Sequence, residues 1–194
     1  MIDKVLAEVV NKLNKYIHVT EPDFVLGNIA LIDAYHDSSA TTNDKVIASV
    51  INIEQEKSLR NLPYRKTVDN PDGTKRGVER EPDIYLNVYL LFGSNKKNYK
   101  TGLLRISQVI SFFQNKFIYM PGDFPEAVSM NVDKLIFDIY STSFDELSQI
   151  WSVMGGKYVP SVMYKMRMAM IQDPKENDTG IIKEIHLNSG NLAT

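Results

Sequence analysis

The chain has 194 residues, of which 43% are hydrophobic and 24% charged, a mixture typical of one globular domain with a sizeable core. Its net charge is −2, which argues against a nucleic-acid-binding protein, because such a protein needs an excess of basic residues. It contains no cysteine, which excludes disulfides, cysteine-ligated zinc and thiol catalysis.

The sequence predicts neither a signal peptide nor a membrane span. The first residues, MIDKVLAEVV, carry acidic side chains and lack a continuous apolar core. The most apolar run, Tyr85–Phe92, contains an asparagine and suits a strand better than a membrane helix. We therefore expect a chain without membrane insertion that folds in a reducing compartment.

The first third of the chain predicts a helix and two strands. Apolar residues recur at helical spacing over 2–17. Residues 24–33 are apolar and branched but interrupted by Gly27, which predicts a strand with a bend or bulge. Residues 45–54 predict a strand whose two apolar faces favour a central place in the sheet.

A long polar segment follows at residues 57–82, and we call it the arm. At its middle, Asn70-Pro71-Asp72-Gly73 has the chemistry of a tight turn, because proline presets the first turn position and glycine tolerates a positive φ. The arm is therefore predicted to be a hairpin that leaves the compact domain. Polar segments of this length are usually functional or disordered.

The second half continues with alternating strands and helices. Strands are expected at 83–93, 117–120 and 133–141, and a helix at 99–115. The strand 83–93 should turn one apolar face to the core: Ile84, Leu86, Val88, Leu90 and Phe92. The helix should bury Leu103, Ile106, Val109, Ile110 and Phe113.

The last part of the predicted domain is a short helix and a methionine-rich strand. Ser143 and Glu146 form a capping-box pattern, and Gly155-Gly156 has the residues favoured just past a helix. The helix between them should turn inward Leu147, Ile150, Trp151 and Met154. The strand enters at Pro160 and should line the core with Val162, Tyr164, Met166, Met168 and Met170, leaving Lys165 and Arg167 for contact on its other face.

These elements predict an α+β fold with a mixed central sheet of about five strands covered by about three helices. We expect one domain over residues 1–172, with the arm inserted at 57–82, and a C-terminal tail over 173–194. Within that tail, residues 181–187 could add an edge strand.

No catalytic or metal motif emerges. The sequence Gly155-Gly156-Lys157 follows a predicted helix, whereas a phosphate loop precedes one. No G-x-S-x-G elbow is present to anchor a nucleophile. One region is rich in the oxygen ligands that hard cations prefer: Glu21, Asp23, Asp33, His36, Asp37 and Asp44. It lacks EF-hand spacing, and solvated turns are rich in aspartate in any case. We expect no cofactor and no enzymatic activity.

Four stretches together resemble one family: residues 52–61, 82–95, 103–116 and 144–171. The most specific part combines Trp151, Gly155, Gly156, Tyr158, Pro160, Ser161, Tyr164, Lys165 and Arg167. In order and spacing these are similar to the N-terminal domain of the tail-terminator or cap proteins of extracellular contractile injection systems, phage-tail-like particles such as the antifeeding prophage. The similarity runs over most of residues 1–172.

The resemblance implies a structural protein that forms a sixfold ring, or hexamer, at the end of the inner tube distal to the baseplate. Such a ring stops tube growth and anchors the last sheath ring, so the implied partners are further copies, the tube protein and the sheath protein. The implied location is the bacterial cytoplasm during assembly and then the particle. This chain is shorter than some relatives and has an extended arm, which leaves open whether a second cap protein is also needed.

Arms and sheet edges are natural contacts for a ring subunit. The candidate interface residues are Arg60, Arg65, Lys66, Asp72, Lys75, Arg76, Arg80, Lys165 and Arg167. Two alternatives remain open: another structural adaptor or baseplate connector of such a particle, and a small-molecule or metal-binding domain with its site near residues 33–44 and Glu54.

Overall fold

The computed structural model describes residues 2–18, 20–32, 42–56, 64–69, 75–80, 84–124, 132–155, 157–170 and 177–179. Its α-helices are α1 (Ile2–Tyr16), α2 (Tyr99–Asn115) and α3 (Phe144–Val153), and two 3-10 turns are η1 (Ile29–Leu31) and η3 (Pro121–Asp123). None of the helices in these ranges is long and apolar enough to cross a membrane. The three helices confirm the segments predicted at 2–17, at 99–115 and after Ser143.

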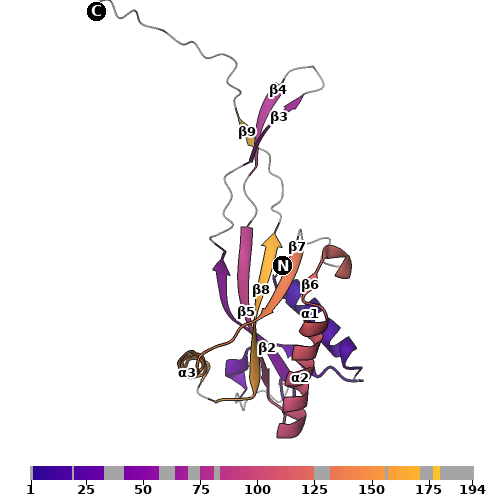
Figure 1. The fold of residues 1–194 in the computed structure, drawn as a ribbon, viewed down its shortest axis with the longest axis vertical. Coiled ribbons are helices and arrows are strands. Elements are labelled where there is room, and N and C mark those ends of the chain that lie inside the picture. Colours follow the sequence, from indigo (N-terminus) through magenta and orange to yellow (C-terminus); the bar gives the residue numbers. More distant parts are fainter. Residues whose placement is uncertain are drawn as a thin grey trace, which may run out of the picture.

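Six strands form the main sheet in the order β1-β2-β5-β8-β7-β6 (Figure 1). Their bounds are β1 (Phe24–Leu26), β2 (Val46–Gln55), β5 (Ile84–Ser94), β6 (Ile118–Tyr119), β7 (Val132–Ile139) and β8 (Ser161–Met170). Only the β1–β2 pair is parallel. A second sheet has the order β3-β4-β9, with β3 (Tyr64–Asp69), β4 (Lys75–Arg80) and β9 (Asn177–Thr179). The α+β class and the mixed sheet are confirmed, with six strands where about five were expected.

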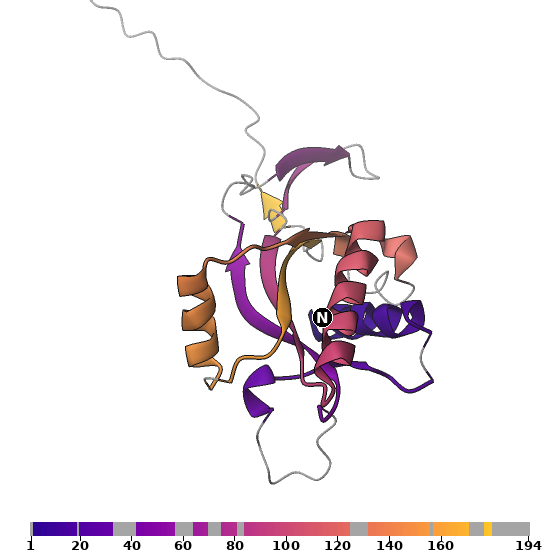
Figure 2. The same ribbon diagram turned by 60° about the horizontal axis from the view of Figure 1, so that its bottom comes forward.

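Helices α1 and α2 cover one face of the main sheet, and α3 lies against the other (Figure 2). The core on the α1–α2 side contains the predicted faces of β5 and β8, with Val88, Leu90, Phe92, Tyr164, Met166 and Met168 all buried. The methionine face of β8 is therefore core in its described part; the side chain of Met170 lies outside the described residues. Aromatic rings fill this core around Phe113, whose ring centroid lies 4.5 Å from Phe137 and 4.6 Å from Tyr164.

The core on the α3 side is smaller. Its buried members are Ile29, Ile47, Leu91, Trp151 and Met163. The predicted inward residues of α3 pack here, with Leu147, Ile150 and Met154 partly buried around Trp151. The predicted capping box is present: Ser143 Oγ accepts from the Glu146 N–H (3.2 Å), and the Glu146 carboxylate accepts from the Ser143 N–H (2.8 Å). Gly155 ends the helix with φ +95°, which confirms the predicted glycine stop.

The strand predicted at 24–33 is wrong beyond Leu26. Ser49 Oγ donates a hydrogen bond to the Gly27 carbonyl (2.5 Å) and accepts one from the Ile29 N–H (2.8 Å). This hydroxyl satisfies backbone groups that the β1–β2 ladder would otherwise pair, and the chain turns into η1. Strand β2 is therefore central only at its start, because β1 pairs with it over Val46, Ile47 and Ala48.

One predicted burial pattern also needs correction. Helix α2 buries Gly102, Ile106, Val109, Phe112 and Phe113. Leu103 and Ile110, which were predicted to face the core, are exposed, because the helix packs on the sheet through a stripe that includes Gly102 and Phe112 instead. On β7, Leu135 and Phe137 are buried, and Ile139 is exposed at the end of the strand.

A glycine in β5 lets η1 approach the sheet. A Cβ atom built on Gly93 would lie 2.0 Å from the Cδ1 atom of Ile29. Ile29 is buried against the α3 side of the sheet, so any side chain at position 93 would displace it.

Candidate docking interface

The arm is a hairpin, as predicted, in which β3 and β4 pair antiparallel. The turn itself, residues 70–74, lies outside the described residues, and so do Asp72 and Arg60 of the candidate interface. The register sets Arg65 opposite Glu79 and Asp69 opposite Lys75. Opposite charges directly across an antiparallel pair favour that register.

The same register gives the hairpin two different faces. Because residues alternate along a strand, one face of the ladder holds Tyr64, Lys66, Val68, Arg76, Val78 and Arg80. This face, which we call the basic arm face, has three basic and no acidic positions on β3 and β4. The opposite face holds Arg65, Thr67, Asp69, Lys75, Gly77 and Glu79, two bases and two acids. The candidate bases of the arm thus divide between a basic and a neutral face.

Strand β9 completes the small sheet by pairing with β4, and its register sets Asp178 opposite Val78 on the basic arm face. Part of the segment expected to be a tail is therefore paired with the arm. The edge strand expected at 181–187 lies outside the described residues. In Figure 1 the small sheet is drawn beyond the end of the main sheet at which β5 begins and β8 ends.

Lys165 and Arg167 alternate along β8 with Met163 of the α3-side core, so they lie on the same side of the main sheet, beyond the residues that pack around Trp151. Arg167 donates two hydrogen bonds to Asp138 Oδ2, at 2.7 and 3.0 Å. The Lys165 Nζ atom lies 4.0 Å from Glu56 Oε2. Both bases, expected to be available for a partner, thus already have acidic neighbours: Asp138 on the adjacent strand β7, and Glu56 just past the end of β2.

This part of the α3 side carries a row of polar groups, which we call the polar half-face: Glu54, Glu56, Asn87, Tyr89, Asp138, Lys165 and Arg167. Asn87 donates to Glu56 (3.0 Å), while its own Oδ1 atom is buried without a donor in the described part of the chain. Burial, with the Glu54 carboxylate beside the phenol, raises the pKa of Tyr89 above its ordinary value. A hollow of about 260 Å³ opens here, bordered by Glu56, Asn87 and Arg167 among others.

In the acidic region considered for a cation, Asp23 stabilises the fold through ion pairs. Asp23, just before β1, accepts hydrogen bonds from Lys96 Nζ (2.5 Å) in the loop before α2 and from Arg105 Nε (2.6 Å) in α2. Burial alone would raise the pKa of Asp23, but these two cations outweigh it and hold the pKa below its usual value. Asp33, His36 and Asp37 lie outside the described residues. In the part of the chain that the structure describes, no three potential metal ligands are grouped together.

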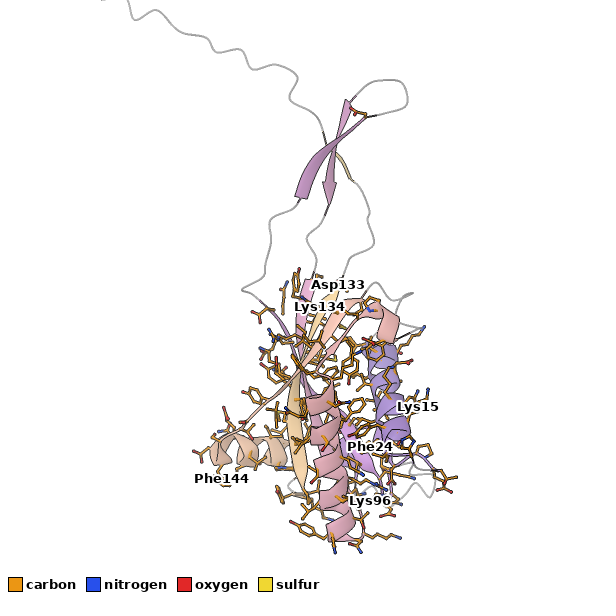
Figure 3. The ribbon with its side chains drawn as sticks, turned by 45° about the vertical axis from the view of Figure 1, so that its right-hand side comes forward. Lys15, Phe24, Lys96, Asp133, Lys134 and Phe144 are labelled. Carbon is orange, nitrogen blue, oxygen red and sulfur yellow. The ribbon has the colours of Figure 1, made fainter. Side chains whose placement is uncertain are left out.

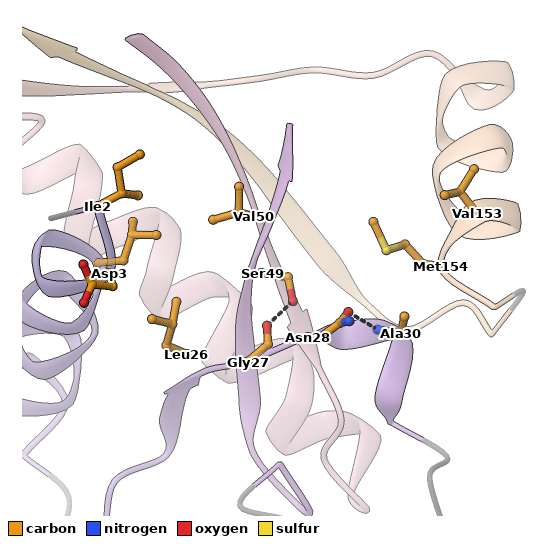
Figure 4. Close-up of a pocket in the computed structure, with 11 residues that line it drawn as sticks. Ile2, Asp3, Leu26, Gly27, Asn28, Ala30, Ser49, Val50, Val153 and Met154 are labelled. Carbon is orange, nitrogen blue, oxygen red and sulfur yellow. Dashed lines mark hydrogen bonds between the residues drawn. The ribbon is translucent and has the colours of Figure 1, made fainter. Parts of the chain in front are cut away.

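Sequence reasoning missed a larger hollow of about 690 Å³ beside the free edge of β2 (Figure 4). Ile2, Leu26 and Val50 border one side, and Asn28, Ala30 and Met154 border the other. The Ser49 hydrogen bond to Gly27 lies between them. Beyond Ala48, no described strand pairs with this edge of β2, although the Ile53 N–H already donates to Asn52 Oδ1 (2.9 Å).

The described residues offer several surfaces that a partner could contact. Some of the described charges pair across strands and helices, and the hollows are bordered by mixed apolar and polar groups. The family model of the Pvc16 N-terminal domain matches residues 3–183 of the sequence. This chain belongs to the Pvc16 N-terminal domain family.

Two solved structures resemble this Pvc16 N-terminal domain protein. One is the sheath/tube terminator of the PVC extracellular contractile injection system in its extended state, with a TM-score of 0.60 and 13% identity over 100% of this chain and 65% of that one. The other is the tube-terminating cap of the anti-feeding prophage, with a TM-score of 0.57 and 14% identity over 96% of this chain and 60% of that one. No protein of curated function matches the sequence. At these identities the likeness shows a shared fold, which is that of tail terminators.

Proposed function

We propose that this protein ends the inner tube of a phage-tail-like contractile injection particle. It acts as a ring of copies, a hexamer, that stops tube growth and holds the last ring of sheath. The observation that carries the proposal is the family match over residues 3–183, together with a fold shared with two terminator proteins. The chain spans 60–65% of the length of those two proteins.

The role is structural and uses no enzyme activity or cofactor. Assembly takes place in the bacterial cytoplasm, and the protein then remains in the particle with the tube and sheath proteins, alone or beside a second cap protein. The basic arm face is the docking element for the particle, because it concentrates Lys66, Arg76 and Arg80 on one side of the hairpin. Complementary charges across an interface steer association more than they add affinity.

The first test removes residues 66–79 from the arm. The main sheet shares no strand pairing with the small sheet in the described residues, so the deletion variant should keep its fold, judged by circular dichroism and thermal unfolding. Mixed with isolated tubes, the intact protein should appear at one tube end in negative-stain images, and the variant should not. Normal capping by the variant would remove the arm from the docking surface, and binding only at the baseplate end would favour a connector.

A matched pair of variants separates the two faces of the arm. Replacing Lys66 and Arg76 by serine removes two bases from the basic arm face, and replacing Arg65 and Lys75 by serine removes two from the neutral face. The first pair should weaken tube-end binding at least tenfold, whereas the second should change it less than threefold. Equal loss from both pairs would mean that only net charge matters.

A further inference from the structure

The outer side of α2 exposes four large apolar side chains that point away from the core. Tyr99, Leu103, Leu104 and Ile110 are exposed to 64, 43, 54 and 38%. Lys100 lies among them, one helical turn before Leu104, and is exposed as well. We call these five residues the α2 face.

A second apolar surface surrounds α3. Phe144, Val153 and Tyr158 are exposed to 91, 82 and 63%. Phe144 projects from the start of the helix, away from the rest of the domain (Figure 3). With the exposed Asp145, these residues form what we call the α3 flank.

The α3 flank is hollowed and contains an unmet hydrogen-bond donor. A depression of about 400 Å³ is bordered by Phe144, Leu147, Trp151 and Tyr158, among others. Trp151 is 5% exposed, and its indole N–H has no acceptor in the described part of the chain. A buried indole N–H normally finds an acceptor, so the hollow is suited to a partner that fills it and supplies one.

The two surfaces carry opposite charge. Helix α2 contains Lys100 and Arg105 and no acidic residue, whereas α3 contains Asp145 and Glu146 and no basic residue. Arg105 is occupied by Asp23, and Glu146 by the cap of α3. Among the described residues, no ion pair involves Lys100 or Asp145, so a positive charge is left on the α2 face and a negative charge on the α3 flank.

We propose that the α2 face of one copy docks on the α3 flank of the next copy. The two surfaces lie on opposite sides of the main sheet, so this contact is heterologous and repeats from copy to copy around a ring (Figure 2). Apolar side chains of the α2 face cover the hollow, and Lys100 meets Asp145. The inference rests on the proposed function in one respect, because closure of the series into a ring is what a terminator requires.

Cysteine cross-linking tests the contact directly, because the chain has no cysteine of its own. Leu103→Cys marks the α2 face, and Phe144→Cys marks the α3 flank. A chain with both changes, treated with a short bismaleimide in concentrated solution and on isolated tubes, should give a ladder of covalent multimers. Each single variant should stay monomeric, and an equal mixture of the two should stop at the dimer.

Charge reversal gives the matched control. Lys100→Glu and Asp145→Lys should each reduce cross-linking of the double-cysteine chain at least fivefold, and the two reversals together should restore it. Lys15→Glu, an exposed change of the same kind on α1, should leave cross-linking unchanged. Loss without restoration would show that Lys100 and Asp145 do not face each other and would overturn the pairing.

The remaining outcomes separate this contact from the proposed function. Dimers from a single-cysteine variant would mean a twofold contact and would overturn the proposal. The absence of a covalent ladder both in solution and on tubes would also overturn the proposal, even if tube ends were still capped. A ladder without tube-end binding would support the contact and contradict the terminator role.

Discussion

The two faces of the main sheet are built differently. On the α1–α2 side, two long helices cover the sheet and a group of packed rings fills the space beneath them. On the α3 side, one short helix covers only the half that contains Ile47, Leu91 and Met163. The other half is the polar half-face, where Arg167 and Asp138 form a half-exposed ion pair.

The difference indicates which side of the sheet stabilises the fold and which side is suited to contacts with a partner. Apolar burial on the α1–α2 side supplies most of the free energy of folding, because that term scales with the apolar area removed from water. An exposed ion pair such as Arg167–Asp138 contributes about 1 kcal/mol or less. The α3 side can therefore change to suit a partner at little cost to folding.

The largest effect is expected from Met168→Lys. Met168 is 1% exposed in the α1–α2 core, so the change buries an unpaired ammonium group and should leave the domain unfolded at 25 °C by circular dichroism. The control is Arg167→Met, the neighbouring residue on the other face, which should cost about 1 kcal/mol or less in urea unfolding. A stable Met168→Lys protein that only failed to associate would place the methionine face in an interface.

The next largest effect on stability is expected from Phe113→Ala. Its ring contacts Phe137, Tyr164, Phe112 and Phe92, so truncation should lower the free energy of unfolding by about 4 kcal/mol. Leu104→Ala, on the exposed side of the same helix, should change it by about 0.5 kcal/mol at most. Similar losses from both would contradict the division of α2 into a buried and an outer face.

Trp151→Ala should have a smaller global effect, although tryptophan is larger than phenylalanine. Trp151 anchors α3 to half of one sheet face, so the helix can detach while the α1–α2 core remains folded. We expect a loss of about 2 kcal/mol and, by hydrogen exchange, faster exchange confined to α3 and the strands beneath it. Faster exchange throughout the main sheet would show that the two faces are one cooperative unit.

The last prediction concerns Asp23, whose contribution to the free energy of unfolding depends on pH. Because Lys96 and Arg105 hold the folded-state pKa below the ordinary 3.8, the ionised carboxylate stabilises the fold above that pH, and the stabilisation is lost as the pH falls below it. Asp23→Asn should therefore cost about 2 kcal/mol at pH 7, and the difference from the parent protein should narrow below pH 3.8. A pH-independent difference would assign the effect to packing.

Local chemistry in the sequence was sufficient to predict most elements. The helical spacing of α1, the capping box and glycine stop of α3, and the alternation of β5 and β8 depend on neighbours a few residues apart. The hairpin of the arm follows from its turn residues in the same way. The resemblance to tail terminators depends on such local patterns in sequence order, and the family match bears it out.

The corrected details all depend on distant partners. The end of β1 is set by Ser49, some twenty residues further along, and the buried stripe of α2 is set by the strands it packs on. The pairing of Arg167 with Asp138 and the contrast between the two sheet faces arise only when β7 and β8 lie side by side. The sequence by itself determined the elements and the family, because both are written in short-range patterns. Which side chains are buried, paired or left for a partner was decided by the tertiary structure, because long-range packing fixes each element's rotation and edge.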